Sequence, residues 1–225
     1  MSERYPFVSG RIARLIGSLL ALALAATAWA DPADEAEAWV RALYFEGLPL
    51  EPAAELDDVA VARLVELLED PAEAAHHGNV VLALGASGHR DAYPVLAAFA
   101  AAAPSGEIDR AGYRARTQLR IAFGYLARSD ERALRWLLDA QAAGATPAWH
   151  FRQQRGDALR SLLDELTLTG LALSGAPAAA VRIERVIDGS PGREPAAQRR
   201  RRHAEAARAV YEQTRQERAA QGRGR

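Results

Sequence analysis

The sequence predicts an all-α protein that is built from about four pairs of short helices. The first observation is composition, because alanine, leucine, arginine and glutamate are abundant in the 225 residues and are the strongest helix formers. The second is that apolar residues recur at helical spacing in short runs that end at glycine. The third is that two of these runs repeat about 40 residues apart, which is the spacing of stacked helix pairs.

The first thirty residues have the layout of a secretory signal peptide. Three arginines precede an apolar stretch at residues 15–26, and Ala28-Trp29-Ala30 places small residues at both positions that a signal peptidase reads. We therefore expect cleavage after Ala30 and a periplasmic or secreted protein with no stable membrane span. The alternative is a retained anchor, but the apolar stretch is shorter than the roughly 20 residues that cross a bilayer.

Composition limits what can hold such an exported protein together. The chain contains no cysteine, so neither a disulfide framework nor a lipid anchor on cysteine is available. Aromatic residues make up only 7% of the chain, so leucine, valine and alanine must fill the core.

The charge separates an acidic body from a basic C-terminal segment. Between Asp31 and Gly192 there are 15 arginines against 24 acidic residues, whereas Arg193–Arg225 has 10 arginines against 4 glutamates. We therefore divide the chain into a signal peptide at 1–30, a helical repeat domain at 31–190 and a basic helix or tail at 191–225.

The basic tail, which contains Arg199, Arg200, Arg201 and Arg202, has three interpretations. It is a solvated helix, it docks on the protein's own acidic surface, or it tethers the protein to an acidic or anionic partner surface. Nucleic acid is not expected, because Tyr211 is the only aromatic residue there and stacking platforms are missing. Alanine-rich faces also bind lipid weakly.

The helices are expected in order along the body. An atypical first pair is expected at 33–47 and 57–69. The next pair lies within Asn79–Phe99, where Gly85 and Gly88 interrupt the apolar pattern and Gly88 suits the left-handed position after a helix. Gly124 aligns with Gly85 at a separation of 39 residues and marks another pair, and a further pair is expected at 157–187.

Local motifs accompany the clearest pair. Asp70-Pro71 opens the unit, the first helix ends in Leu84-Gly85, and a Gly-x-x-Asp turn spans Gly88–Asp91. With these motifs, Leu67–Phe99 resembles the HEAT-like repeat of bacterial proteins, in the variety named after phycobilisome lyases. The resemblance implies an armadillo-type fold, a right-handed α-α superhelix of about four helix pairs.

The match to that repeat is weaker elsewhere. The family usually has Val-Arg where His76 or His77 falls, and Gly78 weakens the start of that helix. The second unit, Asp109–Ala140, lacks the Asp-Pro opening. The resemblance is therefore informative about the fold, whereas the same array serves many partners.

In such arrays the second helices of the pairs line the inner, concave face, where partners bind. The solvent-facing residues expected there are Asp58, Arg63, Tyr93, Arg132 and Arg135. Tyrosine and arginine often anchor interfaces, although these can also be ordinary solvated positions. The leading hypothesis is therefore a non-catalytic exported scaffold that binds a protein or peptide partner on its concave face.

Three histidines define the enzymatic alternative. His76 and His77 are adjacent, so on a helix they point about 100° apart, and no zinc-binding spacing includes them. His89 shares a turn with Ser87 and Asp91, but no GxSxG motif accompanies them. We expect no catalytic residues, no cofactor and no metal. The alternative is an enzyme or lyase-type accessory factor that uses His76, His77 or His89.

Overall fold

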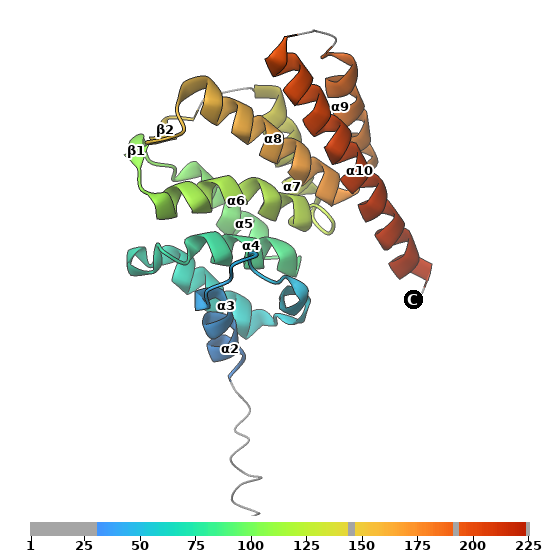
Figure 1. The fold of residues 1–225 in the computed structure, drawn as a ribbon. Helices are drawn as coiled ribbons and strands as arrows, with labels where there is room; N and C mark the ends of the chain where they lie inside the picture. The colour runs from blue at the N-terminus through green and yellow to red at the C-terminus, as the bar shows by residue number, and fades with distance from the viewer. Residues whose placement is uncertain (1–30, 144–146, 191–193, 224–225) are drawn as a thin grey trace, which may run out of the picture.

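The computed structural model describes residues 31–143, 147–190 and 194–223. Within them the fold is all-α, with nine α-helices and two strands of three residues each (Figure 1). The predicted signal peptide and its cleavage after Ala30 lie outside the described residues.

The first helix pair is present where it was expected. Helix α2 (Pro32–Arg41) is capped by Asp31, and α3 (Asp58–Glu69) is capped by Asp57, whose carboxylate accepts the Ala60 N–H at 2.8 Å. The two helices pack against each other, and a 3-10 turn at Glu51–Glu55 lies in the connection between them.

Three helical hairpins and a last helix follow. The hairpins are α4 (His77–Ser87) with α5 (Ala92–Ala101), α6 (Arg110–Leu126) with α7 (Glu131–Ala143), and α8 (Gly156–Ser174) with α9 (Pro177–Asp188); the last helix is α10 (Pro195–Arg223). The first helices α4, α6 and α8 lie side by side, and α10 packs on α8 and α9 (Figure 1). The hairpins begin at residues 77, 110 and 156, so the units differ in length.

Glycines allow the first helices to approach closely. A Cβ on Gly85 would lie 2.5 Å from the Cα of Ala122, and a Cβ on Gly124 would lie 2.5 Å from the carbonyl oxygen of Gly170. Real Cβ atoms do not come this close to backbone, so α4 touches α6, and α6 touches α8, at points where a side chain is absent. The aligned glycines Gly85 and Gly124 are therefore packing positions.

The hairpin turns share a local design. Gly88 and Gly175 both follow a first helix and adopt the left-handed conformation, with φ of 65° and 62°. This confirms the prediction for Gly88. Before each of them a serine donates its hydroxyl to the carbonyl three residues earlier, as Ser87 does to Leu84 at 2.8 Å.

Two loops are joined in a way that the sequence did not indicate. Strands β1 (Gly106–Ile108) and β2 (Trp149–Phe151) pair in parallel, with Glu107 opposite His150. Each strand lies just before a first helix, and Phe151 stacks on Tyr113 of α6 at 4.6 Å. This small sheet therefore fixes the starts of α6 and α8 relative to each other.

The core has two main parts. The larger one runs from α2 to the start of α9, and its centre is α4, whose residues 78–85 are all buried. A helix that is apolar on every side is typical of such a central position. The second part lies between α8, α9 and α10 and includes Leu168, Ile183, Ala207 and Tyr211. The predicted basic tail is therefore a helix with one buried, alanine-rich face.

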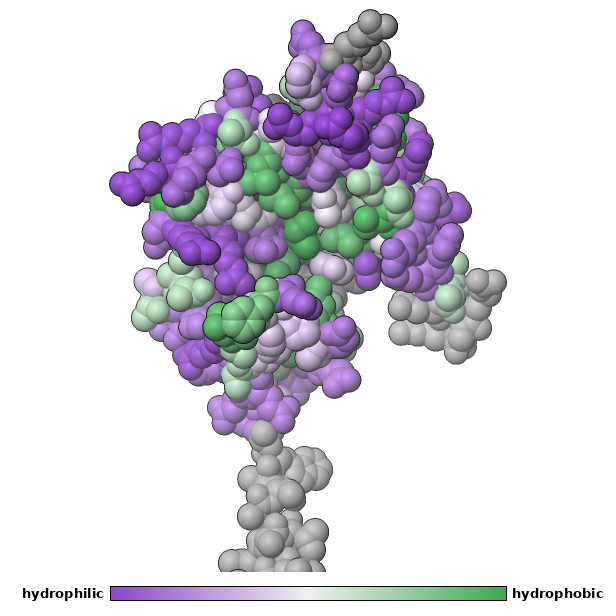
Figure 2. All heavy atoms as spheres, viewed as in Figure 1, coloured by the Kyte–Doolittle hydropathy of each residue, from purple (hydrophilic) through white to green (hydrophobic). Residues whose placement is uncertain are grey.

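The surface of this fold is mostly hydrophilic. Figure 2 shows hydrophilic residues over much of one face and a central band of hydrophobic residues that runs along α8 and between α6 and α10. None of the helices in the described residues is both long and apolar enough to cross a membrane.

Candidate functional site

Three of the predicted partner-binding residues occupy equivalent places in successive second helices. Asp58, Tyr93 and Arg132 lie in the first turns of α3, α5 and α7. The guanidinium of Arg132 lies over the Tyr93 ring, 4.5 Å from its centroid, which is a cation–π contact between two hairpins. Arg135 lies exposed one turn further along α7. We call the surface formed by Tyr93, Arg132 and Arg135 the α5–α7 face.

The position of Arg132 on this face is fixed by a second contact. Its guanidinium donates to the Asp130 carboxylate at 2.7 Å, and Asp130 also accepts the Arg132 backbone N–H at 2.8 Å as the cap of α7. The hydrogen bond from Arg132 lowers the pKa of Asp130 below its ordinary value and raises the pKa of Arg132. Contacts within the fold therefore hold the cation in place over the tyrosine.

Asp58 and Arg63 are not part of the α5–α7 face, because their side chains make contacts elsewhere. Asp58 accepts a hydrogen bond from Nε2 of His89 at 2.8 Å, and this bond lowers the pKa of the carboxyl. Arg63 instead donates to Glu37 of α2 at 2.5 Å and to Glu66 at 2.6 Å. Arg63 thus ties the first two helices together, and its side chain remains partly exposed.

Of the three histidines of the enzymatic alternative, His76 and His77 lie together at the start of α4, whereas His89 lies in the turn after that helix. His77 Nε2 lies 3.0 Å from the carbonyl oxygen of Asp70, and its ring meets the edge of Phe99. His76 is the residue before α4. Within the described residues, no group of three or more His, Cys, Asp or Glu side chains could hold a metal ion.

His89 does not form a triad with Ser87 and Asp91. The Ser87 hydroxyl donates to the Leu84 carbonyl and accepts the His89 backbone N–H at 3.1 Å, while the imidazole bonds to Asp58. The Asp91 backbone N–H donates to His89 Nδ1 at 3.3 Å, whereas the Asp91 carboxylate lies 3.8 Å from that nitrogen, which is too far for a hydrogen bond. Asp91 is the residue before α5, but among the described contacts its side chain caps no backbone N–H.

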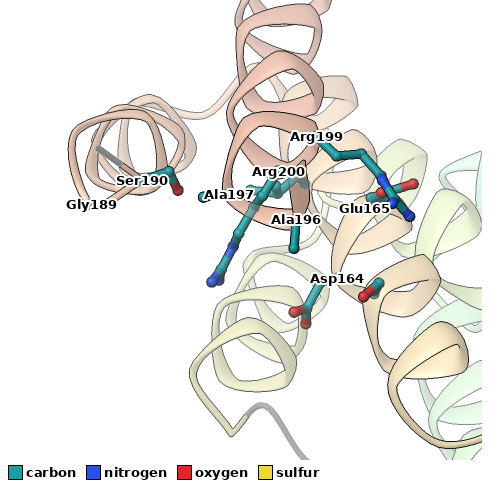
Figure 3. A pocket seen from close by; sticks show the side chains of 10 residues that line it. Asp164, Glu165, Gly189, Ser190, Ala196, Ala197, Arg199 and Arg200 are labelled. Atoms are coloured by element: carbon teal, nitrogen blue, oxygen red, sulfur yellow. The ribbon is translucent and has the colours of Figure 1, made fainter. Parts of the chain in front are cut away.

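A partly open cavity with charged and apolar walls lies at the other end of the fold. It has a volume of about 350 Å³ and is lined by α8, the end of α9 and the first turns of α10 (Figure 3). Its walls carry charges of both signs, and the lining residues are Ser161, Asp164, Glu165, Leu168, Gly189, Ser190, Ala196, Ala197, Arg199 and Arg200.

The charged side chains of this cavity come from two helices. In Figure 3, Arg199 extends toward Glu165, whereas Arg200 extends past Ala197 on the other side of α10. Asp164 also interacts electrostatically with Arg120 of α6. Burial of the Arg120 guanidinium lowers its pKa to about 10, and the nearby Asp164 charge opposes that shift.

The cavity could not be found from the sequence, because α10 has to dock before it exists. The run Arg199–Arg202 was noticed as a basic tail, and docking on an acidic surface of the same chain was one interpretation of it. The structure brings Arg199 and Arg200 to the same cavity as Asp164 and Glu165. All four arginines of the run are exposed, but Arg201 and Arg202 do not line the cavity, and Arg201 pairs with Glu205 at 3.0 Å.

The α5–α7 face and the cavity both have guanidinium, carboxylate or aromatic groups at accessible positions. Groups of these kinds bind partners and ligands in proteins. The α5–α7 face is a surface of two helices, whereas the cavity is lined by residues of α8, α10 and the end of α9. Comparisons of this chain with protein-family models, with curated proteins and with solved structures found no match.

Proposed function

We propose that this chain is an exported, non-catalytic scaffold of the HEAT-like type and that it binds a protein or peptide partner on the α5–α7 face. The observation that carries the proposal is the Arg132–Tyr93 contact, which joins two successive second helices at 4.5 Å. A tyrosine and a pre-positioned arginine on adjacent repeats form a rigid anchor pair of the kind that dominates many interfaces.

The arrangement of the hairpins supports the repeat part of this proposal. First helices α4, α6 and α8 pack in sequence order, which is how a solenoid buries faces that a single hairpin cannot bury. The turns after α4 and α8 repeat the same Ser-Gly chemistry. Right-handed superhelical stacking with the second helices inside would place the α5–α7 face on the concave side.

The partner part of the proposal depends on exposed groups that the fold itself does not need. Arg135 is exposed on α7, and Arg132 remains about half exposed although it contacts Asp130 and Tyr93. A partner that covers this face would shield the cation–π contact from water and strengthen it.

Affinity capture with the full chain tests the proposal. Material bound by the wild-type chain is compared with that bound by the double variant Tyr93→Ala, Arg135→Ala. The matched control is Arg208→Ala, which removes an exposed arginine on α10. We expect the double variant to lose one or more partners that the control retains. Equal recovery of every partner by all three chains would contradict the proposal.

A further inference from the structure

We propose that the cavity between α8, α9 and α10 binds a small zwitterion, a molecule that carries one carboxylate and one ammonium group. The anionic end would face Arg200 on α10, and the cationic end would face Asp164 on α8. This site is distinct from the α5–α7 face and does not depend on the scaffold proposal.

The size of the cavity suits a small molecule. Its volume of about 350 Å³ lies at the lower end of the range for ligand pockets, which is about 300–1,000 Å³. Leu168 provides an apolar surface at the cavity, and the buried Ser190 lies at its α9 wall with its hydroxyl donating to the Val186 carbonyl at 2.8 Å. A ligand with a short apolar body and polar ends matches this lining.

The charges select the class of ligand. Asp164 and Glu165 would repel a ligand that is only anionic, and Arg199 and Arg200 would repel one that is only cationic. Figure 3 shows Arg199 extending toward Glu165, whereas Arg200 extends on the other side of α10, so we assign the two ends of the ligand to Arg200 and Asp164. A zwitterion is the ligand that satisfies both of those groups at once.

The surrounding structure holds Asp164 and the α10 wall in place. Arg120, half-buried on α6, adds positive potential near Asp164 and donates to the Thr167 hydroxyl one turn along α8 at 3.1 Å. On the other wall, His203 Nε2 lies 2.8 Å from the Glu165 carbonyl oxygen, which links α10 to α8 next to the cavity. The two charged walls therefore cannot move apart without breaking contacts between helices.

The probes are three ω-amino acids of increasing length, namely glycine, 4-aminobutyrate and 6-aminohexanoate. Each is titrated into the full chain and followed by isothermal titration calorimetry and by amide NMR shifts. Butyrate and butylamine are the singly charged controls. We expect at least one zwitterion to bind ten times more tightly than either control and to shift the amides of Gly189, Ser190 and Ala196. The preferred length reports the distance between the two charged walls.

Two variants remove one charge each from the cavity. Asp164→Asn and Arg200→Gln are each expected to weaken binding of the preferred probe at least tenfold. The matched controls, Asp157→Asn on α8 and Arg202→Gln on α10, remove the same charges at exposed positions that do not line the cavity and should leave binding unchanged. Circular dichroism melting curves confirm that each variant is folded.

Three results would overturn the proposal. The first is the absence of saturable binding by every zwitterion at millimolar concentration. The second is equal binding of butyrate or butylamine, which would indicate a simple ion site. The third is shifted amides that lie away from the cavity, an outcome that does not depend on whether any variant folds.

Discussion

At the scale of single residues, arginine serves as the cap of helix C-termini in this lysine-free chain. Arg116 donates to the carbonyls of Phe99 and Ala102 at the end of α5, and Arg128 donates to the Leu173 carbonyl near the end of α8 at 2.8 Å. The last carbonyls of a helix have no partner within it and carry partial negative charge, so a guanidinium stabilises them. The cost is desolvation, which lowers the pKa of Arg116 and Arg128.

Burial also desolvates the Arg120 guanidinium, but this side chain donates to a hydroxyl and not to a helix-end carbonyl that would offset the cost. Its guanidinium donates to the Thr167 hydroxyl, which itself donates to the Leu163 carbonyl, and its pKa is lowered to about 10 by burial. Because the folded pKa lies below the unfolded one, the penalty is present at every pH below about 10. We expect Arg120→Met to raise the free energy of unfolding by about 1–3 kcal/mol, as measured by urea denaturation at pH 7.

The matched variant for this prediction is Arg116→Met. Its side chain is also buried, but its removal leaves two helix-end carbonyls without a donor and ends the contact with the Phe99 ring at 4.1 Å. It should lower the free energy of unfolding by about 1–3 kcal/mol. Loss of stability in both variants would show that the Arg120 contacts outweigh its desolvation.

Asp130 gives a prediction for acid pH. Its folded pKa lies below the ordinary value of 3.8 because Arg132 donates to it, so its contribution to stability is full above that value and is lost as the pH falls through the folded pKa. Asp130→Asn keeps an acceptor for the cap but removes the charge. The variant should show a smaller fall in melting temperature between about pH 5 and pH 2 than the wild type. Asp139→Asn, an exposed change on the same helix, should keep the wild-type slope.

At the scale of helices, close approach at glycine decides how the hairpins pack. Gly85→Ala places a methyl group 2.5 Å from Ala122 backbone, which cannot move without shifting α6. Gly78→Ala in the same helix meets the flexible side chain of Arg114 at 2.9 Å. We expect Gly85→Ala to cost about 1–3 kcal/mol, although alanine is the better helix former. Gly78→Ala should be neutral within about 1 kcal/mol in chemical denaturation, and similar losses would contradict the packing role.

Much of the helical layout was predictable, because helix starts and ends have local causes. Asp57, Asp109 and Asp130 each accept a backbone N–H at a helix start, and Gly88 ends α4 in the left-handed conformation. Such signals lie within a few residues of the event that they mark. They can therefore be recognised in a single sequence, and so can the apolar period that marks each helix.

Contacts between distant segments were not predictable in the same way. The pairing of β1 with β2 joins residues about 40 positions apart and leaves no alternating pattern in three-residue strands. Of the predicted partner-binding residues, Tyr93 and Arg132 meet, but Arg63 is taken up by Glu37 across α2 and α3. Both outcomes depend on where a neighbouring helix lies, which composition and spacing do not specify.

At the scale of the whole molecule, α10 completes the fold as its last layer. Its buried face consists of Ala204, Ala207, Tyr211 and Thr214, spaced three or four residues apart, and it covers the apolar side of α8 and α9. The last layer of a fold needs a hydrophilic outer surface, and the arginines and glutamates on the other sides of α10 supply it. The basic segment thus shields the end of the core and at the same time forms one wall of the zwitterion cavity.

This arrangement makes the docking of α10 testable with two neighbouring alanines. Ala207 is buried against the cluster of α8 and α9, with 4% of its surface exposed, whereas Ala206 is exposed. Ala207→Glu forces an unpaired carboxylate into that cluster and should lower the free energy of unfolding by at least about 2 kcal/mol. Ala206→Glu adds the same charge to the same helix in solvent and should change the free energy of unfolding by less than about 0.5 kcal/mol.

Because the cavity needs α10 in place, Ala207→Glu should also abolish binding of the preferred zwitterion, whereas Ala206→Glu should retain it. If Ala207→Glu left stability and hydrogen-exchange protection of α10 unchanged, the helix would not be docked on α8 and α9 in solution, and the cavity would have lost one of its walls.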